Sequence, residues 1–431
     1  MEKETKKPMS KARFWITLLC LGFCWSIVYL VPYLQYTWYD PFKEFIGGTN
    51  TQLGLLLSIY GLGNIFGAPV GGWIADRFNY KIIYVLSVGL NAVFALLFLV
   101  HPTYGFAVLM WIGFAIASLM LNYPTHIKIV RQLAPPEQQG TIFGFNETFI
   151  GVGNIVLAAA MMFAFQAAAN DIAGIKAAII CNAVISIGLT IAIFFLLPNP
   201  TKEDLEAART KEDEKTNILK DIGKIVVQPA TWLVGMSIFA VYSFMTTLTY
   251  FTPYFTEVLG VTVVFSGWAA IARQYGMQIV GAPVGGIATD KIKSPAKVLL
   301  VVYVVSAAGL IYMLAPKSGN VSVGFLIALL LVLSFFCYIG RGSYYATLEE
   351  CGVDRNLSAS TIGVAAILGF SPDLFQFTLF GYWMDTKGVD AYPLMFSYQL
   401  VVIILGIISA FLILRLKKKN EAKATTEAQT E

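Results

Sequence analysis

The sequence has little charge and few metal-binding side chains. Of its 431 residues, 13% are charged and 57% are hydrophobic, whereas soluble domains carry about a quarter charged residues. Almost no charge falls within the long apolar runs, which excludes a large soluble core and indicates an integral membrane protein. The two histidines cannot build a metal site alone, and the five cysteines have no paired metal or redox spacing.

The absence of catalytic and metal-binding motifs also excludes several classes of function. We find no nucleotide-binding loop, metal cluster or nucleophile motif, so we expect no enzyme, no cofactor and no metal. The net charge of +4 is not a signal for nucleic acid. Residues 1–13 are charged but lead into a full-length span with no small-residue cleavage site, which predicts a retained tail and not a signal peptide.

Long apolar runs dominate what remains. A transmembrane helix needs about 20 apolar residues, and twelve such runs can be placed. They are 14–37, 52–75, 81–100, 104–127, 140–166, 175–197, 230–256, 264–289, 296–315, 321–347, 358–384 and 391–416. The predicted organisation is a tail (1–13), a six-helix bundle (14–197), a charged linker (198–229), a second six-helix bundle (230–416) and a polar tail (417–431) that we expect to be disordered.

The basic residues predict the orientation. With both termini inside, twenty-four of the 30 lysines and arginines fall in segments predicted to be cytoplasmic. The external loops hold Lys43, Lys176, Lys317 and Lys387, and the other two, Arg273 and Arg341, lie inside spans. We therefore expect a multi-pass protein of the cell (inner) membrane, surrounded by the lipid bilayer, with both termini and the linker cytoplasmic.

The two halves repeat each other. Residues 67–76 read Gly-Ala-Pro-Val-Gly-Gly-Trp-Ile-Ala-Asp, and residues 281–290 read Gly-Ala-Pro-Val-Gly-Gly-Ile-Ala-Thr-Asp, with seven of ten positions identical at an offset of 214. A second pair of segments, 29–33 and 250–254, places two tyrosines around a proline in both halves. Such a duplication predicts two parallel six-helix repeats with a cavity between them.

On these motifs, the whole chain resembles the major facilitator superfamily of secondary transporters. The family pattern Gly-x-x-x-Asp-Arg/Lys-x-Gly-Arg-Arg/Lys is matched by residues 72–81, although Asn79 replaces the second glycine and Tyr80 replaces one basic residue. Because asparagine tolerates a left-handed turn better than most residues, the Asn79 departure is mild. The pattern Arg-x-x-x-Pro-x-Glu-x-x-Gly is matched by residues 131–140. The resemblance implies an all-α fold of twelve transmembrane helices and a secondary transporter, which we expect to be a monomer.

The duplicated loops are predicted to gate the transporter. Gly67, Gly71 and Gly72 remove side chains so that helices 2 and 11, the second and eleventh predicted spans, can approach closely. Asp76 near a helix C-terminus needs a basic partner or a facing helix N-terminus, and such a partner can be lost in another conformation. The alternative is a static surface ion pair. The predicted gating residues are Gly72, Asp76, Arg77, Lys81, Arg131, Asp290 and Lys291.

Charges within spans are costly and mark functional sites. Arg273 in helix 8 lies about 24 Å from the helix end at Thr289, and Arg341 in helix 10 lies between two glycines. An arginine in helix 8 also resembles the anion-binding arginine of oxalate/formate antiporters, nitrate porters and monocarboxylate transporters, and guanidinium binds carboxylates bidentately. Either arginine could instead reach the membrane surface or pair with an acid.

Further candidates surround these arginines. Glu147 in helix 5 and Asp373 in helix 11 are predicted to couple protons or to form charge pairs. Tyr29, Tyr33, Tyr250 and Tyr254 are predicted to line the substrate site, with helix packing as the alternative. His126 and Lys128 are predicted to be interfacial.

The resulting prediction is a transporter that moves a small organic anion by alternating access, coupled to protons or to solute exchange. Two alternatives stay open. One is a carrier of a neutral solute such as a sugar, with the charges paired among themselves. The other is a membrane receptor that binds a ligand without translocating it.

Overall fold

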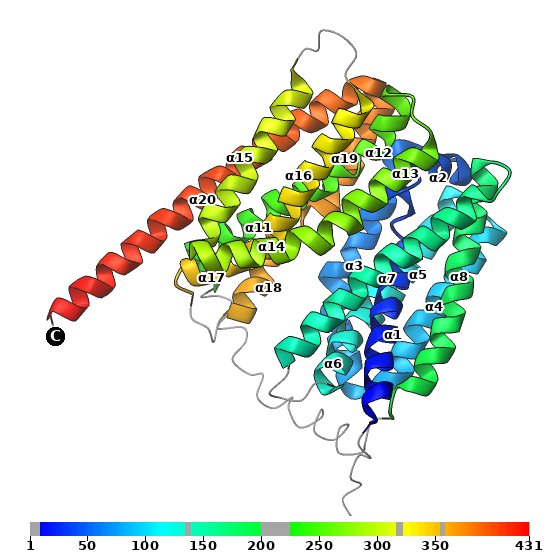
Figure 1. Ribbon diagram of the computed structural model, residues 1–431, viewed down its shortest axis with the longest axis horizontal. Coiled ribbons are helices and arrows are strands. Elements are labelled where there is room, and N and C mark those ends of the chain that lie inside the picture. Colours follow the sequence, from blue (N-terminus) through cyan, green and yellow to red (C-terminus); the bar gives the residue numbers. More distant parts are fainter. Residues whose placement is uncertain (1–8, 134–138, 200–224, 316–321, 354–357, 431) are drawn as a thin grey trace, which may run out of the picture. The chain divides into compact units, whose positions relative to one another are not determined.

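The computed structural model describes residues 9–133, 139–199, 225–315, 322–353 and 358–430. All regular structure in this part of the chain is helical (Figure 1). The contacts group Met1–Lys215 with Thr262–Ile271 in one compact unit, and Thr216–Val261 with Ala272–Glu431 in a second. The helices are given below in chain order, half by half; α13 (Val263–Ile271), in the second half of the chain, belongs to the first unit.

The helices of the first half are interrupted by short turns and by one π-helical segment. They are α1 (Lys11–Leu30), the 3-10 turn η1 (Leu34–Tyr36), α2 (Tyr39–Ile46), α3 (Asn50–Arg77), α4 (Tyr80–Val100), α5 (Tyr104–Ala115), the π-helix η2 (Ile116–Asn122), α6 (Tyr123–Leu133), α7 (Gln139–Gln166) and α8 (Asp171–Leu196).

The second half contains two π-helical segments and a broken helix near its end. Its elements are α11 (Pro229–Leu248), α12 (Phe251–Pro253), the π-helix η5 (Tyr254–Val258), α13 (Val263–Ile271), the π-helix η6 (Ala272–Gly276), α14 (Met277–Ile292), α15 (Pro295–Leu314), α16 (Val323–Ser343), the 3-10 turn η7 (Tyr344–Ala346), α17 (Thr347–Glu350), α18 (Ser358–Gly369), α19 (Pro372–Lys387), the 3-10 turn η9 (Gly388–Asp390) and α20 (Ala391–Thr430).

The predicted spans all contain helix. Over the described residues, nine helical stretches are long and apolar enough to cross a membrane, and the last of them, Thr361–Ala422, contains two predicted spans. The two other predicted spans correspond to α3 and to α13 with η6 and α14, the helices that carry the duplicated glycine motif. The predicted all-α fold with twelve transmembrane helices is therefore confirmed.

Both units pair their helices in the same way. In the first unit, α1 packs on α7, α4 on α8, α1 on α8, and α3 on α5 and η2. In the second unit, the corresponding pairs are α11 with α18, α15 with α20, α11 with α20, and α14 with α16. The internal repeat seen in the sequence is thus also a repeat of packing.

The turns after the two copies of the duplicated motif differ from each other. Asn79 has φ −63° and caps α4, because its Oδ1 accepts hydrogen bonds from the amides of Lys81 (3.0 Å) and Ile82 (3.4 Å). The left-handed conformation that asparagine tolerates is therefore not used at Asn79. Lys293, which occupies the equivalent place in the second copy, is left-handed with φ 53° and ends α14 by donating its amide to the Thr289 carbonyl at 2.9 Å.

The C-terminal segment differs from expectation, since α20 continues as a helix to Thr430. Contacts with distant residues hold its polar part, one of them a hydrogen bond from Lys417 Nζ to the Lys293 carbonyl at 3.3 Å. Lys417 forms an ion pair with Glu350 at 3.3 Å, and the Asn420 amide donates to the Cys351 carbonyl at 3.1 Å. These contacts explain why the prediction of disorder from Lys417 onward is wrong, while the cytoplasmic location of the tail stays a prediction.

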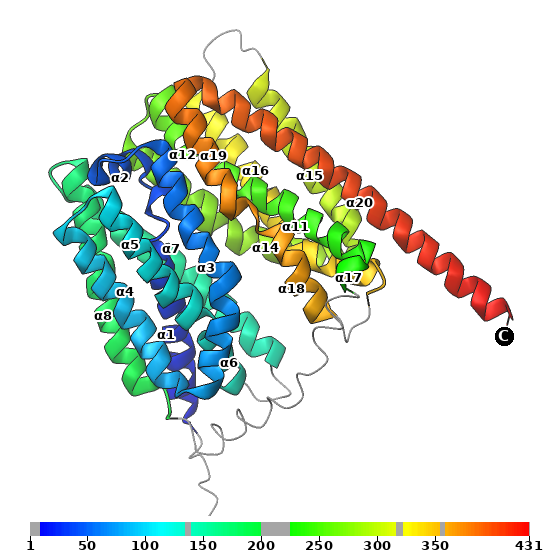
Figure 2. The ribbon, with the colours of Figure 1, turned by 180° about the vertical axis from the view of Figure 1, so that it is seen from behind.

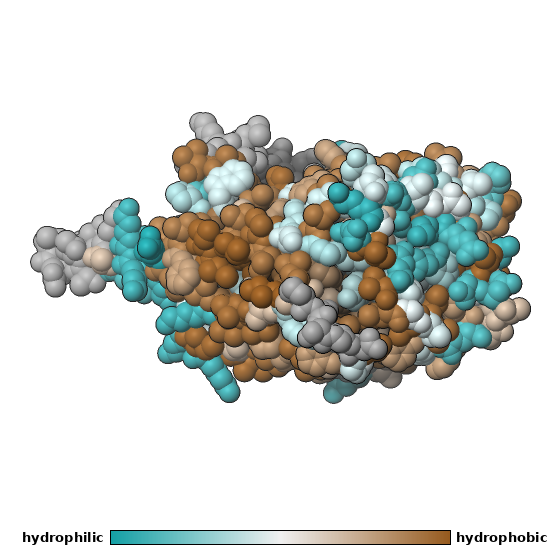
Figure 3. Space-filling model, turned by 90° about the horizontal axis from the view of Figure 1, so that it is seen from above, coloured by the Kyte–Doolittle hydropathy of each residue, from teal (hydrophilic) through white to brown (hydrophobic). Residues whose placement is uncertain are grey.

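The surface agrees with a membrane-embedded chain. Figure 3 shows broad areas of hydrophobic side chains interspersed with hydrophilic ones. Among the exposed residues are Val100, Phe195 and Phe66, which are 78%, 70% and 67% exposed. Such exposure would be unfavourable in water and is favourable against lipid chains.

Candidate functional site

The duplicated glycines bring helices of the same unit together. A Cβ on Gly71 would collide with the backbone carbonyl of Met120 in η2, and one on Gly67 would lie 3.3 Å from Met120 Cβ. In the second unit, a Cβ on Gly285 would collide with the carbonyl of Ile339 in α16. The face of α3 that carries Gly67 and Gly71 therefore packs on the helix of α5 and η2. The approach of helices 2 and 11 stays a prediction.

Gly72 differs from its neighbour, because nothing lies within 4 Å of a Cβ built on it, and the same holds for Gly286. Each copy of the motif thus places a crowded glycine next to an open one. The crowded glycine serves helix packing. The open glycine leaves the helix surface around it without a neighbouring side chain or backbone atom within 4 Å of its Cβ position. The gating role of Gly72 stays a prediction.

The end of α3 is surrounded by basic side chains. The guanidinium of Arg77 lies over the Trp73 ring, 4.5 Å from its centroid. Lys128 of α6 donates to the Ala75 carbonyl at 2.6 Å and so places a positive charge at the helix C-terminus. Lys128 is therefore part of this helix end, and the prediction that it is merely interfacial was incomplete. The side chain of Asp76 lies outside the described part of the structure.

Two other predicted gating residues of the first unit lie apart from this helix end. The ammonium of Lys81 lies over the Phe194 ring, 5.0 Å from its centroid. Arg131 is exposed near the end of α6. Neither position tests a gating role.

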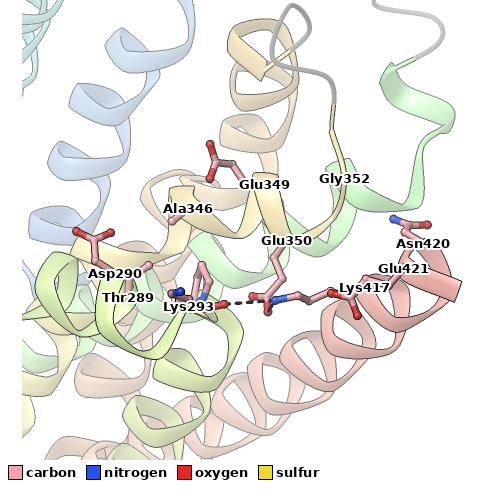
Figure 4. A pocket seen from close by; sticks show the side chains of 11 residues that line it. Thr289, Asp290, Lys293, Ala346, Glu349, Glu350, Gly352, Lys417, Asn420 and Glu421 are labelled. Carbon is pink, nitrogen blue, oxygen red and sulfur yellow. Dashed lines mark hydrogen bonds and ion pairs between the residues drawn. The ribbon is translucent and has the colours of Figure 1, made fainter. Parts of the chain in front are cut away.

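The second copy of the motif lines a cavity of about 480 Å³. Asp290 is exposed on one side of it, and Lys291 follows at the surface. Figure 4 shows Lys417 of α20 reaching Glu350 of α17, with Asp290 and Thr289 of α14 across the cavity. The second half thus ends in a mixed-charge cluster drawn from four helices.

Glu350 is the centre of that cluster, and the sequence analysis missed it. Its side chain is 6% exposed, accepts hydrogen bonds from Ser294 Oγ (2.6 Å) and the Ala296 amide (2.8 Å), and pairs with Lys417. The carboxylate therefore sits at the N-terminus of α15, where negative charge is favourable. Two adjacent acids after an apolar run look like solvated loop residues, so the sequence carries no clear signal for this role.

Arg273 and Arg341 lie in the same unit. Arg273 belongs to the π-helix η6, is 2% exposed and lies 3.4 Å from the Gln274 side-chain oxygen. Arg341 is exposed near the end of α16, and its guanidinium donates to Met245 Sδ at 3.3 Å. Both arginines are within electrostatic reach of Tyr338. The two charges thus lie on η6 and α16, which pack against each other.

Asp373 lies at a break in helix 11. α18 ends at Gly369, and α19 begins at Pro372. Asp373 follows in the first turn of α19, where the helix N-terminus favours its charge. It is 4% exposed, and the Tyr242 hydroxyl lies 2.9 Å from both of its carboxylate oxygens. Tyr242 is in turn within electrostatic reach of Arg341.

A buried polar cluster continues along the same helices. The Gln376 amide donates to Thr246 Oγ1 (2.8 Å) and Thr247 Oγ1 (2.9 Å), and Ser243 Oγ lies 2.7 Å from Gln376 Oε1. Gln399 of α20 joins through Thr247 at 2.9 Å. Each of these side chains is at most 1% exposed. The cluster holds α11, α19 and α20 together and fixes the backbone that carries Tyr242 and Asp373.

The first unit has its own polar network, centred on His126. This residue is 1% exposed, lies 2.8 Å from the Tyr84 hydroxyl through Nδ1, and lies 3.2 Å from Asn146 Oδ1 through Nε2. The prediction of an interfacial His126 is therefore wrong, because three helices enclose it. Glu147 follows Asn146 on α7 and is exposed.

The four predicted tyrosines fall into two classes. Tyr29 and Tyr33 are half-buried, and their rings contact Trp25 (5.4 Å between centroids) and Tyr60 (5.3 Å). Tyr250 is 3% exposed and donates its hydroxyl to the Phe377 carbonyl at 3.1 Å, and Tyr254 is 9% exposed. The phenol of Tyr250 therefore joins α12 to α19, and a substrate-binding role for all four stays a prediction.

In the described part of the chain, no group of three or more His, Cys, Asp and Glu side chains is placed to hold a metal ion. The polar side chains described above are arranged as hydrogen-bonded pairs and networks. Their chemistry suits the binding of a polar solute by fixed charges.

Comparison with known proteins agrees with this architecture. The family model described as Major Facilitator Superfamily matches residues 13–347. The chain is 30% identical over 405 residues to Inner membrane protein YqcE of Escherichia coli (strain K12), which covers 93% of this chain and 95% of that protein.

Solved structures resemble it in fold. A bacterial homolog of the human lysosomal transporter Spinster, inward-facing and unoccupied, has a TM-score of 0.70 at 15% identity, covering 95% of this chain and 98% of that one. A mutant of the nucleoside transporter NupG has a TM-score of 0.71 at 13% identity, covering 94% and 99%.

The chain is therefore an integral membrane transporter and not an enzyme. It belongs to the major facilitator superfamily, which confirms the family predicted from the duplicated motif. The likeness to solved structures supports the fold alone, because the identities are low.

Proposed function

We propose that the chain is a secondary active transporter of a small organic anion, with Arg341 as the principal anion-binding side chain. One observation carries this proposal. Arg341 lies within a predicted span, is exposed, and donates to a thioether, which is a weak acceptor. The ion pairs of the described residues do not include Arg341. A guanidinium has five N–H donors, so the donors that face the solvent can hold a carboxylate bidentately.

Arg273 supports the same role from a buried position. Its side chain is 2% exposed, so an anion cannot reach it in this conformation without movement. Its charge nevertheless adds to the positive potential around Tyr338, which both arginines share. We therefore assign Arg273 to the binding site as a second cation that a substrate contacts when η6 moves. π-helical segments often occur at functional sites, because they insert an extra residue into a helix.

Asp373 and Tyr242 form the proposed coupling element. The carboxylate accepts from the Tyr242 hydroxyl, but a protonated carboxyl is itself a donor. Protonation of Asp373 would therefore weaken its hydrogen bond with Tyr242, because the bond is no longer charge-assisted. The Tyr242 hydroxyl could then turn and donate to an anion on Arg341. Glu147 of the first unit is the second candidate for proton coupling, and exchange of one solute for another is the alternative source of energy.

The orientation and the gate complete the proposal. We place both termini and the linker in the cytoplasm, on the excess of basic residues in those segments. The helix ends at Asp76, Arg77 and Lys81 and the cavity beside Asp290 then face the cytoplasm. Rearrangement of these charges would accompany the change between inward- and outward-facing states.

Uptake into proteoliposomes tests the substrate class. The purified chain is reconstituted and supplied with labelled carboxylates and with neutral sugars and nucleosides, with and without a pH gradient. We expect uptake of a carboxylate and none of a neutral solute. Uptake of a neutral solute alone would favour the alternative carrier, and binding without uptake would favour the receptor. Dependence on the pH gradient that is lost in Asp373→Asn would identify the coupling acid.

A further inference from the structure

A groove in the second unit has the features of a lipid-binding site. It has a volume of about 600 Å³ and lies between the start of α11 and the last third of the membrane span of α20. Its walls are apolar side chains such as Trp232, Met236, Ile408 and Leu412, and Arg415 and Lys419 line one end. Figure 2 shows α20 running past α11 and continuing toward the C-terminus.

The floor of the groove is a fixed contact between the two helices. Ser409 of α20 is 2% exposed and donates to the Leu233 carbonyl of α11 at 2.9 Å. Its apolar walls are open, since Ile408 and Leu412 are 49% and 41% exposed. The helices therefore hold a groove that an acyl chain can enter without displacing protein contacts.

The length of the groove matches one leaflet of a bilayer. Leu405 and Arg415 lie ten residues apart on α20, which is about 15 Å of helix at 1.5 Å per residue. The hydrocarbon core of a bilayer is about 30 Å thick, so one leaflet provides about half of that. Trp232 at the same end donates its indole N–H to the Val226 carbonyl at 2.8 Å, in keeping with the preference of tryptophan for the membrane interface.

The charges at the end of the groove select the headgroup. Arg415 and Lys419 are exposed one helical turn apart, and none of the hydrogen bonds or ion pairs of the described residues involves either one. No carboxylate lines the groove. Two cations in a groove whose described lining contains no acid attract a phosphate and offer nothing to the ammonium of a zwitterionic headgroup.

We propose that this groove binds one anionic phospholipid, with an acyl chain between α11 and α20 and the phosphate on Arg415 and Lys419. The apolar walls distinguish a lipid from free inorganic phosphate, because a bare anion would gain nothing from them. The paired cations distinguish a lipid from a second copy of the chain, which would have to bring an anion to the same place. The site is separate from the proposed substrate site around Arg341.

Native mass spectrometry of the delipidated full chain tests the proposal. The probes are dioleoylphosphatidylglycerol, dioleoylphosphatidylethanolamine and inorganic phosphate. We expect one phosphatidylglycerol to bind at least tenfold more tightly than phosphatidylethanolamine, and phosphate not to compete. Each basic residue near a lipid surface contributes about 1 kcal/mol, so Arg415→Gln and Lys419→Gln should each weaken binding about fivefold.

Two matched controls come from the same helix. Lys418→Gln removes an exposed charge that does not line the groove, and Phe411→Trp enlarges an exposed side chain outside it. Both should bind lipid like the wild type, whereas Leu412→Trp should fill the groove and abolish tight binding. If Leu412→Trp fails to fold, Arg415→Gln and Lys419→Gln still test the proposal.

Three results would overturn the proposal: equal affinity for the two lipids, equal losses in Lys418→Gln and Arg415→Gln, or competition by inorganic phosphate. If the chain formed a dimer that excluded lipid from the groove, the occupant of the groove would be a second copy of the chain and not a lipid.

Discussion

Replacing Gly71 by alanine should destabilise the fold, whereas the same change at Gly72 should not. The added Cβ at position 71 meets the Met120 carbonyl, while at position 72 it meets nothing within 4 Å. The obstacle at position 71 is backbone, so it cannot rotate away as a side chain can. α3 and η2 must then separate.

The two substitutions should change the free energy of unfolding differently. Overpacking a core typically costs about 1–3 kcal/mol, and a backbone obstacle places Gly71→Ala at the upper end, about 3 kcal/mol. Alanine is favoured over glycine inside a helix by about 1 kcal/mol, so Gly72→Ala should be neutral or stabilising. The two neighbouring variants should thus differ by about 3 kcal/mol, which for a unit of this size is about 6–12 °C in Tm.

Thermal unfolding of the purified variants in detergent measures this difference. Gly285→Ala and Gly286→Ala repeat the comparison in the second unit, where the obstacle is the Ile339 carbonyl. Similar Tm values for the two members of either pair would refute the packing of the duplicated motif described above. A transport assay on Gly72→Ala then asks whether the open glycine serves the gate, since its folding is unaffected.

Three further predictions concern the second cluster, one turn and the topology. Glu350→Gln should lower the unfolding free energy by about 2 kcal/mol, because the buried carboxylate loses its ion pair and its charge-assisted bonds. Glu349→Gln, at the exposed neighbour, should change the unfolding free energy by less than about 0.5 kcal/mol. Equal effects of the two substitutions would contradict the buried role of Glu350. Lys293→Gly should raise Tm, since a left-handed non-glycine residue costs about 1 kcal/mol, and a fall in Tm would count against that strain. Cysteines placed at Lys211 and Lys317 should react with an impermeant reagent from opposite sides of the membrane, and labelling from one side only would exclude the twelve-span orientation.

The fold could be predicted because long apolar runs have one main solution in a bilayer. Every predicted span contains helix, and some ends agree closely, as for 81–100 against Tyr80–Val100. Others do not, as for 14–37 against Lys11–Leu30. The repeat could be recognised in the sequence because the glycine motif, around Gly71 in the first half and Gly285 in the second, is needed for close helix packing. The breaks were less visible: Pro372 indicated the interruption of helix 11, but nothing in the residues around Arg273 indicated a π-helix.

The contacts between distant residues could not be predicted. His126 lies near the end of an apolar run and looks interfacial, yet Tyr84 and Asn146 from two other helices enclose it. Lys417 belongs to a polar tail, and its order depends on Glu350, far away in the chain. Such pairs depend on which faces of the helices pack against each other. The residues near each member of a pair do not indicate which distant helix it will meet.

The central claim is that Arg341 binds the anionic group of the substrate. The most direct test measures binding of the carboxylate identified by the uptake panel to the wild type, Arg341→Lys and Arg341→Gln, with each variant first shown to unfold at the wild-type temperature. Lysine keeps the charge but loses the planar fork, and a charge-assisted hydrogen bond contributes about 1.5–3 kcal/mol. We expect Arg341→Gln to weaken binding about ten- to hundredfold and Arg341→Lys to fall in between. Unchanged affinity in Arg341→Gln would contradict the account, and full recovery of affinity in the double variant Arg341→Gln with Asp373→Asn would mean that the two charges only balance each other.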